Sequence, residues 1–340
     1  MARDVFILGA GFSKAIYSGM PLLRELGMKA LTHLSHDAPY IPPGLDPTDF
    51  EGWLSYLSDD QPWLLPEESL RNRAGFLRIS RLISDIISEH ESEAKRRPMP
   101  DWLCLLITYW HQTKSTVLTF NYDLLVEAAF ENTVRVYSRP GDQQNYVNAR
   151  QIITAPLMPA GARQGAVLAA STIESFQLMK LHGSRSWVYS GRESFYGEVI
   201  YDATTEFGWN EKQPHWIDRL IVDKVPLVVP PTNGKSNFFN NETVRSQWRL
   251  SLEALRHADR VFVVGYSFPS TDHMTRYLLQ ESHHADRKVI LVSRSTAAME
   301  RLPNFIPTES IDTPIIGDRA VHELAYQFDV TGNEAVAYAT

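Results

Sequence analysis

Apolar and polar residues along this chain form two kinds of pattern, and together they predict strands separated by helices. Short, mostly β-branched runs predict buried strands at 4–8, 115–120, 176–181, 226–229, 261–264 and 288–292. Apolar residues at helical spacing predict helices at 21–36, 67–93, 240–257 and 271–283, and a further helix from Thr296. Strands that alternate with helices of this length indicate an α/β fold with a parallel sheet and crossover helices.

Two stretches interrupt this alternation. Residues 50–110 have helical patterns throughout and predict a helical subdomain inserted between the first two strands. Residues 138–175 are rich in Pro, Gly, Ala and Ser and predict an irregular insertion. After it, residues 187–201 predict a pair of antiparallel β-strands. We therefore predict a single Rossmann-like domain over 1–340 that carries both insertions.

Composition narrows the class of protein. The chain has 340 residues, of which 44% are hydrophobic and 21% charged, as is typical of a globular protein. Its formal charge of -7 argues against non-specific nucleic-acid binding. The one cysteine, Cys104, lies in an apolar run and cannot form a disulfide or a cysteine zinc site within the chain. No secretory signal or membrane-spanning run is evident, so we expect a cytoplasmic protein without a membrane partner.

Polar or glycine-rich residues follow four of the predicted strands. These segments are Gly9-Ala10-Gly11-Phe12-Ser13, Asn121-Tyr122-Asp123, His182-Gly183-Ser184 and Gly265-Tyr266-Ser267. Each segment alone is compatible with a plain turn or a helix cap. Because ligands of open α/β sheets bind outside the carboxyl ends of the strands, four such segments predict one shared cleft.

The first of these segments is suited to binding phosphate. A strand, a glycine turn and a helix in this order bring backbone N–H groups towards the phosphates of a nucleotide. Lys14 stands where the dinucleotide fingerprint has its third glycine. On this segment alone, a nucleotide-binding loop and a tight turn without a ligand both stay open.

Taken in order, the segments resemble the catalytic core of the sirtuins. The resemblance rests on Gly9–Ser13, on Gly19, Pro21 and Arg24 of a second glycine-containing segment, on Asn121 and Asp123, and on His182-Gly183. Leu22 replaces an aspartate of the sirtuin pattern, and one cysteine cannot form the four-cysteine zinc ribbon of sirtuin deacylases. With Trp187 and with Asp272 after Gly265-Tyr266-Ser267, the chain looks more like the divergent sirtuin-like proteins of bacterial antiphage defence, which include NAD hydrolases.

The resemblance implies a sirtuin-like fold, NAD as the substrate, no metal, and hydrolysis of the nicotinamide–ribose bond to nicotinamide and ADP-ribose. It implies that Asn121 and His182 are the catalytic pair. An amide can hydrogen-bond both a ribose and a water, and an imidazole is suited to proton transfer near neutral pH. The implied NAD-binding residues are Gly9, Ala10, Gly11, Phe12, Ser13, Pro21, Arg24, Asp123, Gly183, Gly265, Tyr266, Ser267 and Ser293. For Asp123 we favour orienting Asn121 or capping the following helix over direct contact with the ribose.

Two other functions stay open: a sensor that binds NAD or ADP-ribose without turnover and acts through assembly, and an NAD-dependent protein deacylase. The missing zinc ribbon and Leu22 disfavour the deacylase. Because a free cytoplasmic NAD hydrolase would kill its host, we expect a latent activity, with 50–110 and 138–175 as candidate control elements. We also expect a homo-oligomer and an activating partner protein or phage-derived trigger.

Overall fold

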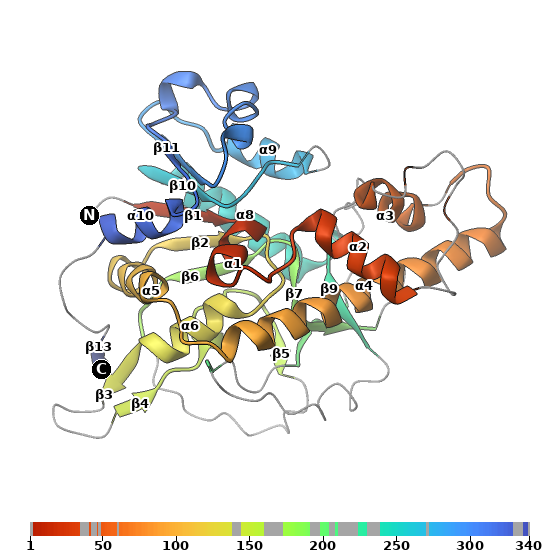
Figure 1. Ribbon diagram of the computed structural model, residues 1–340, viewed down its shortest axis with the longest axis horizontal. Helices are drawn as coiled ribbons and strands as arrows, with labels where there is room; N and C mark the ends of the chain where they lie inside the picture. The colour runs from red at the N-terminus through yellow and green to blue at the C-terminus, as the bar shows by residue number, and fades with distance from the viewer. Residues whose placement is uncertain are drawn as a thin grey trace.

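A parallel sheet of six strands forms the centre of the protein. The computed structural model describes residues 3–34, 41, 46, 49–59, 61–137, 144–159, 173–190, 198–203, 208–209, 224–229, 239–269, 272–328 and 336–338. The order of the strands is β12-β11-β10-β1-β2-β6, and every neighbouring pair is parallel (Figure 1). Their bounds are β1 (Asp4–Leu8), β2 (Thr116–Thr119), β6 (Gln177–Lys180), β10 (Arg260–Val264), β11 (Lys288–Ser293) and β12 (Ile315–Ile316). The predicted α/β class is confirmed.

The strand order reverses beside β1. The chain places β2 and then β6 on one side of β1, and later places β10, β11 and β12 on the other side. The carboxyl ends of β1 and β10 therefore flank the point at which the topology switches. Ligands of open α/β sheets bind at such points, and here the flanking residues are Gly9 and Gly265.

Residues of β1 alternate between two hydrophobic cores, one on each face of the sheet. Phe6 and Leu8 enter the core that contains residues of α5 (Asp101–Thr113), α6 (Leu125–Thr133) and α10 (Ala320–Gln327). Val5 and Ile7 enter the core that contains residues of α8 (Glu242–Arg256) and α9 (His273–Glu281). Because successive strand residues point to opposite faces, a sheet covered on both sides reads as a continuous apolar run.

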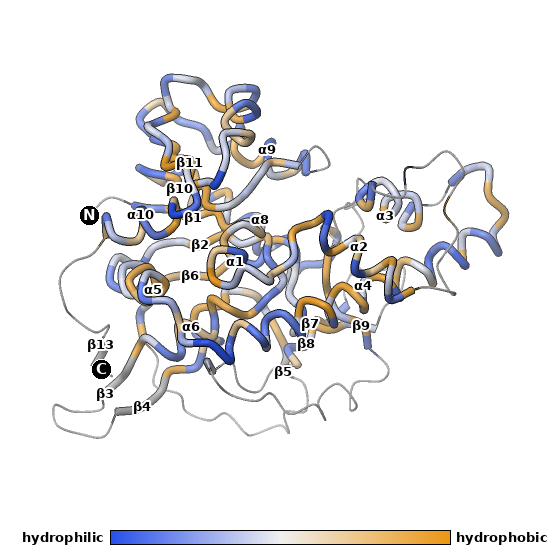
Figure 2. The backbone as a smooth tube through the Cα atoms, in the orientation of Figure 1, coloured by the Kyte–Doolittle hydropathy of each residue, from blue (hydrophilic) through white to orange (hydrophobic). Residues whose placement is uncertain are grey.

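Three helices between β1 and β2 pack together beside the sheet. After the short α1 (Ala10–Ile16), they are α2 (Leu23–Leu34), α3 (Phe50–Ser58) and α4 (Pro66–Lys95), and they project to one side of the molecule in Figure 1. The tube of α4 alternates between hydrophilic and hydrophobic along its length in Figure 2, as an amphipathic helix does. By contrast α5 covers the sheet, because the Trp110 ring packs against Phe6 at 5.3 Å between centroids. Within the described ranges no helix has the length and apolar character of a membrane span.

A second sheet begins directly after the parallel one. Only Leu181 and His182 separate β6 from β7 (Gly183–Tyr189), which pairs antiparallel with both β8 (Tyr201–Asp202) and β9 (Val225–Val228). The pairing of Trp187 with Asp202 confirms the predicted antiparallel pair. The strand predicted at 226–229 exists, but the prediction that it belongs to the parallel sheet is wrong. It completes the sheet β5-β8-β7-β9, in which β5 is Met158–Pro159.

Two further stretches differ from expectation or are only partly described. The helix predicted from Thr296 is wrong: the chain forms 3-10 turns at Thr296–Ala298, Leu302–Asn304 and Thr308–Ser310, since Pro303 and Pro307 lack the N–H that an α-helix needs. Of the insertion at 138–175, residues 138–143 and 160–172 lie outside the described residues. The remainder includes β4 (Gln144–Tyr146), which pairs with β3 (Arg135–Tyr137), and β3 pairs in turn with β13 (Val336–Tyr338).

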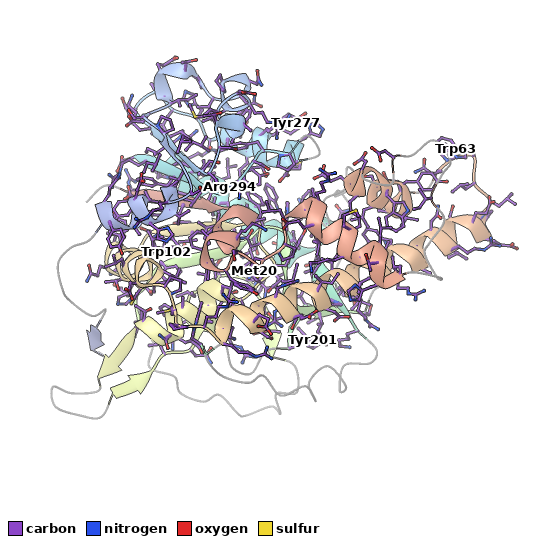
Figure 3. The ribbon with its side chains drawn as sticks, in the orientation of Figure 1. Met20, Trp63, Trp102, Tyr201, Tyr277 and Arg294 are labelled. Carbon is purple, nitrogen blue, oxygen red and sulfur yellow. The ribbon has the colours of Figure 1, made fainter. Side chains whose placement is uncertain are left out.

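We expect Trp110→Ala to lower the free energy of unfolding by about 3–5 kcal/mol, because it removes a large side chain from a closed core. Trp110 is fully buried and contacts the rings of Phe6, Phe12 and Phe176. Trp63→Ala is the matched control. Trp63 is 71% exposed and lies far from the sheet (Figure 3), so its loss should change stability by less than about 0.5 kcal/mol. Urea unfolding followed by circular dichroism measures both, and equal losses would contradict the core assignment.

Candidate active site

The segment Gly9–Ser13, which follows β1 and includes the first residues of α1 (the β1 loop), is in direct backbone contact with Gly265–Ser267, which follows β10 (the β10 loop). The N–H of Gly9 donates to the carbonyl of Val264 at 3.0 Å, and the N–H of Gly11 donates to that of Gly265 at 2.9 Å. A Cβ on Gly9 would lie 2.6 Å from the Gly265 oxygen, and one on Gly11 would lie 2.8 Å from the Gly265 Cα. Gly265 itself has φ +63. The structure thus gives these glycines a reason other than the approach of phosphates: only glycine lets the two loops touch.

Asn121 is held by the β1 loop. Its side-chain Nδ2 donates to the carbonyl of Gly9 and to the hydroxyl of Ser13, both at 2.9 Å. The Ser13 hydroxyl in turn donates to the Asp123 carboxylate at 2.6 Å. Ser13 and Asp123 are buried, whereas Asn121 is half-buried. The network uses both N–H groups of the amide, so it fixes the amide plane and leaves the amide oxygen as the acceptor for a ligand.

Asp123 is positioned by buried groups on its other side. Its carboxylate accepts a hydrogen bond from the Leu125 N–H at 3.2 Å, at the start of α6. Its backbone carbonyl accepts one from Lys180 Nζ at 2.7 Å, and Lys180 also donates to Glu127 at 2.7 Å. Burial raises the pKa of the Asp123 carboxyl, although Lys180 and Ser13 act in the opposite direction. Asp123 therefore both supports Asn121 through Ser13 and contacts the first turn of α6.

His182 lies in a buried aromatic setting at the end of the neighbouring strand. Its ring centroid is 4.8 Å from that of Phe120 and 6.4 Å from that of Trp248. Its Nε2 lies 3.7 Å from the Asp272 carboxylate, which also accepts a hydrogen bond from the Tyr266 hydroxyl. Since Thr119 pairs with Lys180 in the register of β2 and β6, Asn121 and His182 follow adjacent strands at the same edge of the sheet.

Several predicted NAD-binding residues have side chains inside the protein. The ring of Phe12 packs edge-on against Trp102 at 5.7 Å, so it belongs to the core. The ring of Tyr266 stacks on Phe120 at 4.6 Å, and its hydroxyl is bonded to Asp272. Gly183 has φ +79, and a Cβ there would meet the Leu227 carbonyl at 2.1 Å. Because the ring of Phe12 is in the core, only the backbone of this residue is available to contact a ligand at the strand ends.

The remaining predicted residues lie nearer the surface. Ala10 is exposed in the β1 loop, and Ser267 is exposed after β10, where its carbonyl accepts a hydrogen bond from Arg301 at 2.8 Å. Ser293 ends β11 and is half-buried. Pro21 is half-buried, and Arg24 is exposed in the first turn of α2. Their roles toward a ligand stay predictions.

A buried ionic group that the sequence analysis did not find joins α4 to this site. The Glu91 carboxylate accepts two hydrogen bonds from Arg185 at 2.6 and 2.7 Å and one from the Leu124 N–H at 3.0 Å. Lys95 lies 3.8 Å away. Burial alone would raise the pKa of Glu91, but Arg185 and its other partners hold it at about 2. The sequence does contain a sign that Glu91 is buried, because this residue follows Ile83 and Ile87 at four-residue spacing on the apolar face of the helix.

One family model matches more than half of the chain. A model of the SIR2-like domain matches residues 115–312. A solved structure titled for the mechanism and regulation of Sir2 enzymes is 15% identical and has a TM-score of 0.44, with 96% of this chain and 90% of that chain covered. Another, titled for the structural basis of sirtuin substrate affinity, is 14% identical with a TM-score of 0.43 and coverage of 97% and 94%. No curated protein matches the sequence.

We expect Glu91→Gln to lower the free energy of unfolding by about 3 kcal/mol at pH 7. The difference between the ordinary pKa of 4.5 and about 2 corresponds to this amount. Because the pKa is depressed in the folded protein, the stabilisation is present above pH 4.5 and is lost as the pH falls towards 2. Urea unfolding measures the free energy of unfolding of the variant and of the unsubstituted protein. The difference between the two proteins should be smaller at pH 3 than at pH 7.

Glu93→Gln is the control for this substitution. Glu93 lies on the same helix with a side chain that is 44% exposed and is paired with Arg96 at the surface. Surface ion pairs contribute about 0–1 kcal/mol, so this variant should differ little from the unsubstituted protein at either pH. A Glu91→Gln difference that is the same at both pH values would show that the charge of Glu91 is not what stabilises the fold.

Proposed function

The chain belongs to the SIR2-like domain family, and on this premise we propose that it is an NAD glycohydrolase, which converts NAD and water to nicotinamide and ADP-ribose. Membership of the family supports an enzyme that uses NAD. The observation that carries the finer proposal is the position of Asn121 and His182. They follow adjacent strands, at the edge of the sheet where the topology also switches between β1 and β10.

The reaction requires little covalent chemistry from the protein. Nicotinamide is a cationic leaving group on the anomeric carbon, and it departs as a neutral molecule with the electron pair of the C–N bond. The ribose then has oxocarbenium character, as in glycoside hydrolysis. A water oxygen forms the new bond to the anomeric carbon and gives up one proton. The protein must therefore orient the ribose, admit the water and accept that proton.

Asn121 is suited to the orienting role. Its amide is fixed by Gly9 and by the Ser13–Asp123 pair, so its oxygen has a defined direction before any ligand binds. In the proposed reaction this oxygen accepts a hydrogen bond from a ribose hydroxyl or from the attacking water. Preorganised polar groups of this kind contribute most when they need no rearrangement during the reaction.

His182 is suited to accept the proton. In the proposed reaction its neutral imidazole takes the proton of the water or of a ribose hydroxyl. The aromatic rings of Phe120 and Trp248 pack beside the imidazole and limit the access of bulk water to it. The rest of NAD would lie along the crevice between β1 and β10, with the pyrophosphate at the β1 loop and Arg24, and the adenosine side at Gly265, Ser267 and Ser293.

We extend the proposal to a role in antiphage defence through depletion of cellular NAD. It is supported by the residues that resemble the divergent sirtuin-like proteins of that class and by the single cysteine, since a four-cysteine zinc ribbon cannot be built from one. In this proposal the activity is latent until a partner or phage-derived trigger arrives. The expected observation is a fall in NAD in phage-challenged bacteria that express the protein, but not in those that express Asn121→Ala.

We expect Asn121→Ala and His182→Ala each to lower the rate of nicotinamide release from NAD by about a hundredfold or more, since each removes a group that acts on the reacting atoms. Asn304→Ala is the control, because Asn304 is exposed in a 3-10 turn and is not among the predicted site residues. Because the activity is proposed to be latent, the rate is measured in lysates of phage-challenged cells as well as with the purified protein, by chromatography of nicotinamide and ADP-ribose. Size-exclusion chromatography of the purified samples records the assembly state.

Three outcomes would decide between the functions that the sequence left open. Release of nicotinamide from NAD alone supports the glycohydrolase. Release that requires an acylated peptide, with formation of acyl-ADP-ribose, would replace it with a deacylase. Tight binding of NAD in calorimetry without product, in cells and in vitro, would replace it with a sensor.

A further inference from the structure

We propose that Asp272 is a positioning residue for His182, and that the two form a carboxylate–imidazole pair completed by Tyr266. This proposal rests on the proposed function, because it assigns a role within the same reaction. No role is predicted for Asp272 from the sequence, and Tyr266 is predicted to bind NAD. The structure instead points the Tyr266 hydroxyl at the Asp272 carboxylate, which faces the imidazole.

The geometry of the group supports this assignment. The side chain of Asp272 is 1% exposed and that of His182 is 8% exposed, and the carboxylate Oδ2 lies 3.7 Å from His182 Nε2. Tyr266 donates to the same oxygen. The Tyr266 ring is fixed by its stack on Phe120, and Phe120 also contacts the imidazole. A carboxylate that is buried in such a setting must interact with charged or polar groups to stay ionised.

A purely structural role as a helix cap does not explain Asp272. The residue stands at the N-cap of α9, where an aspartate side chain normally accepts a hydrogen bond from the first turn. Here the side chain makes no capping hydrogen bond. Its carboxylate is directed instead to Tyr266, which follows β10, and to His182, which follows β6.

The pair has a chemical consequence for the base. A carboxylate beside Nε2 favours the tautomer with its proton on that nitrogen, which leaves Nδ1 as the basic atom. It also favours the protonated imidazole and so strengthens the base. The phenols of Tyr266 and Tyr122 lie in the same region and stay neutral, because burial and the charge of Asp272 raise the pKa of both. Phe120 and Trp248, which pack on the ring, carry no charge.

The test is the pH profile of NAD hydrolysis by Asp272→Asn. We expect kcat at the alkaline plateau to fall about tenfold or more while KM changes less than about twofold, because the base is weaker but the NAD contacts remain. Loss of the carboxylate lowers the pKa of the imidazole, so the acid limb of kcat/KM should move down by about one pH unit. Tyr266→Phe should move the limb in the opposite direction, since it removes the hydrogen bond that offsets part of the carboxylate charge.

Asp286→Asn is the matched control, because Asp286 is an exposed carboxylate in the turn that follows α9. A profile of Asp272→Asn that coincides with this control would overturn the proposal. The proposal would also be overturned if Asp272→Asn and Tyr266→Phe both lost activity but kept the acid limb of kcat/KM at its original pH. Residues that only support the fold would behave in this way.

A second readout separates this proposal from the proposed function. Proton NMR titration follows the His182 imidazole in the unsubstituted protein and in Asp272→Asn, with its signal identified by its absence from His182→Asn. A lower titration midpoint in Asp272→Asn supports the pair even if NAD is not hydrolysed, in which case only the proposed function fails. An unchanged midpoint in a folded variant overturns the pair whatever the activity.

Discussion

The close approach of the β1 and β10 loops is the constraint on which the rest of the site depends. Gly9 and Gly11 touch the backbone of Gly265, and the N–H groups of both donate to carbonyls of β10 and its loop. This contact fixes the carbonyl of Gly9, which is one of the two groups that orient the Asn121 amide. A side chain at any of the three glycines would separate the strands at their carboxyl ends and would move Asn121 with them.

Charged side chains in the interior form a second layer beneath these loops. Lys180 and Glu127 are each 1% exposed, and Arg185 and Glu91 bury most of their side chains. Burying ions is costly unless each is paired and hydrogen-bonded, and a hydrophobic substitute is often as stable. These ions instead place particular backbone atoms: Lys180 binds the carbonyl of Asp123, and Glu91 binds the N–H of Leu124. The segment after β2 is thereby held at several points before it meets a ligand.

The sequence was sufficient for five of the six parallel strands, because strands such as β1 and β10 are apolar on both faces and are bounded by glycine or polar residues. It did not predict β12, whose two residues are too few to form a recognisable apolar run. It was also sufficient to place Asn121 and His182 at the same edge. It was not sufficient to place β9, since a short apolar strand looks the same in a parallel and an antiparallel sheet. Nor did it show that Phe12 is a core residue, or that Asp272 approaches His182. These facts depend on contacts between residues that are far apart in the chain.

The helix α4 adds a mechanical property to this arrangement. At 1.5 Å per residue its 30 residues extend about 45 Å, from the projecting end near Trp63 to the region beneath the sheet. Glu91 lies near the inner end, one hydrogen bond from Leu124, the residue that follows Asp123. A continuous helix resists bending much more than a loop does. The projecting end of the molecule is therefore joined through one unbroken helix, and through Glu91 and Leu124, to the backbone that carries Asn121 and Asp123.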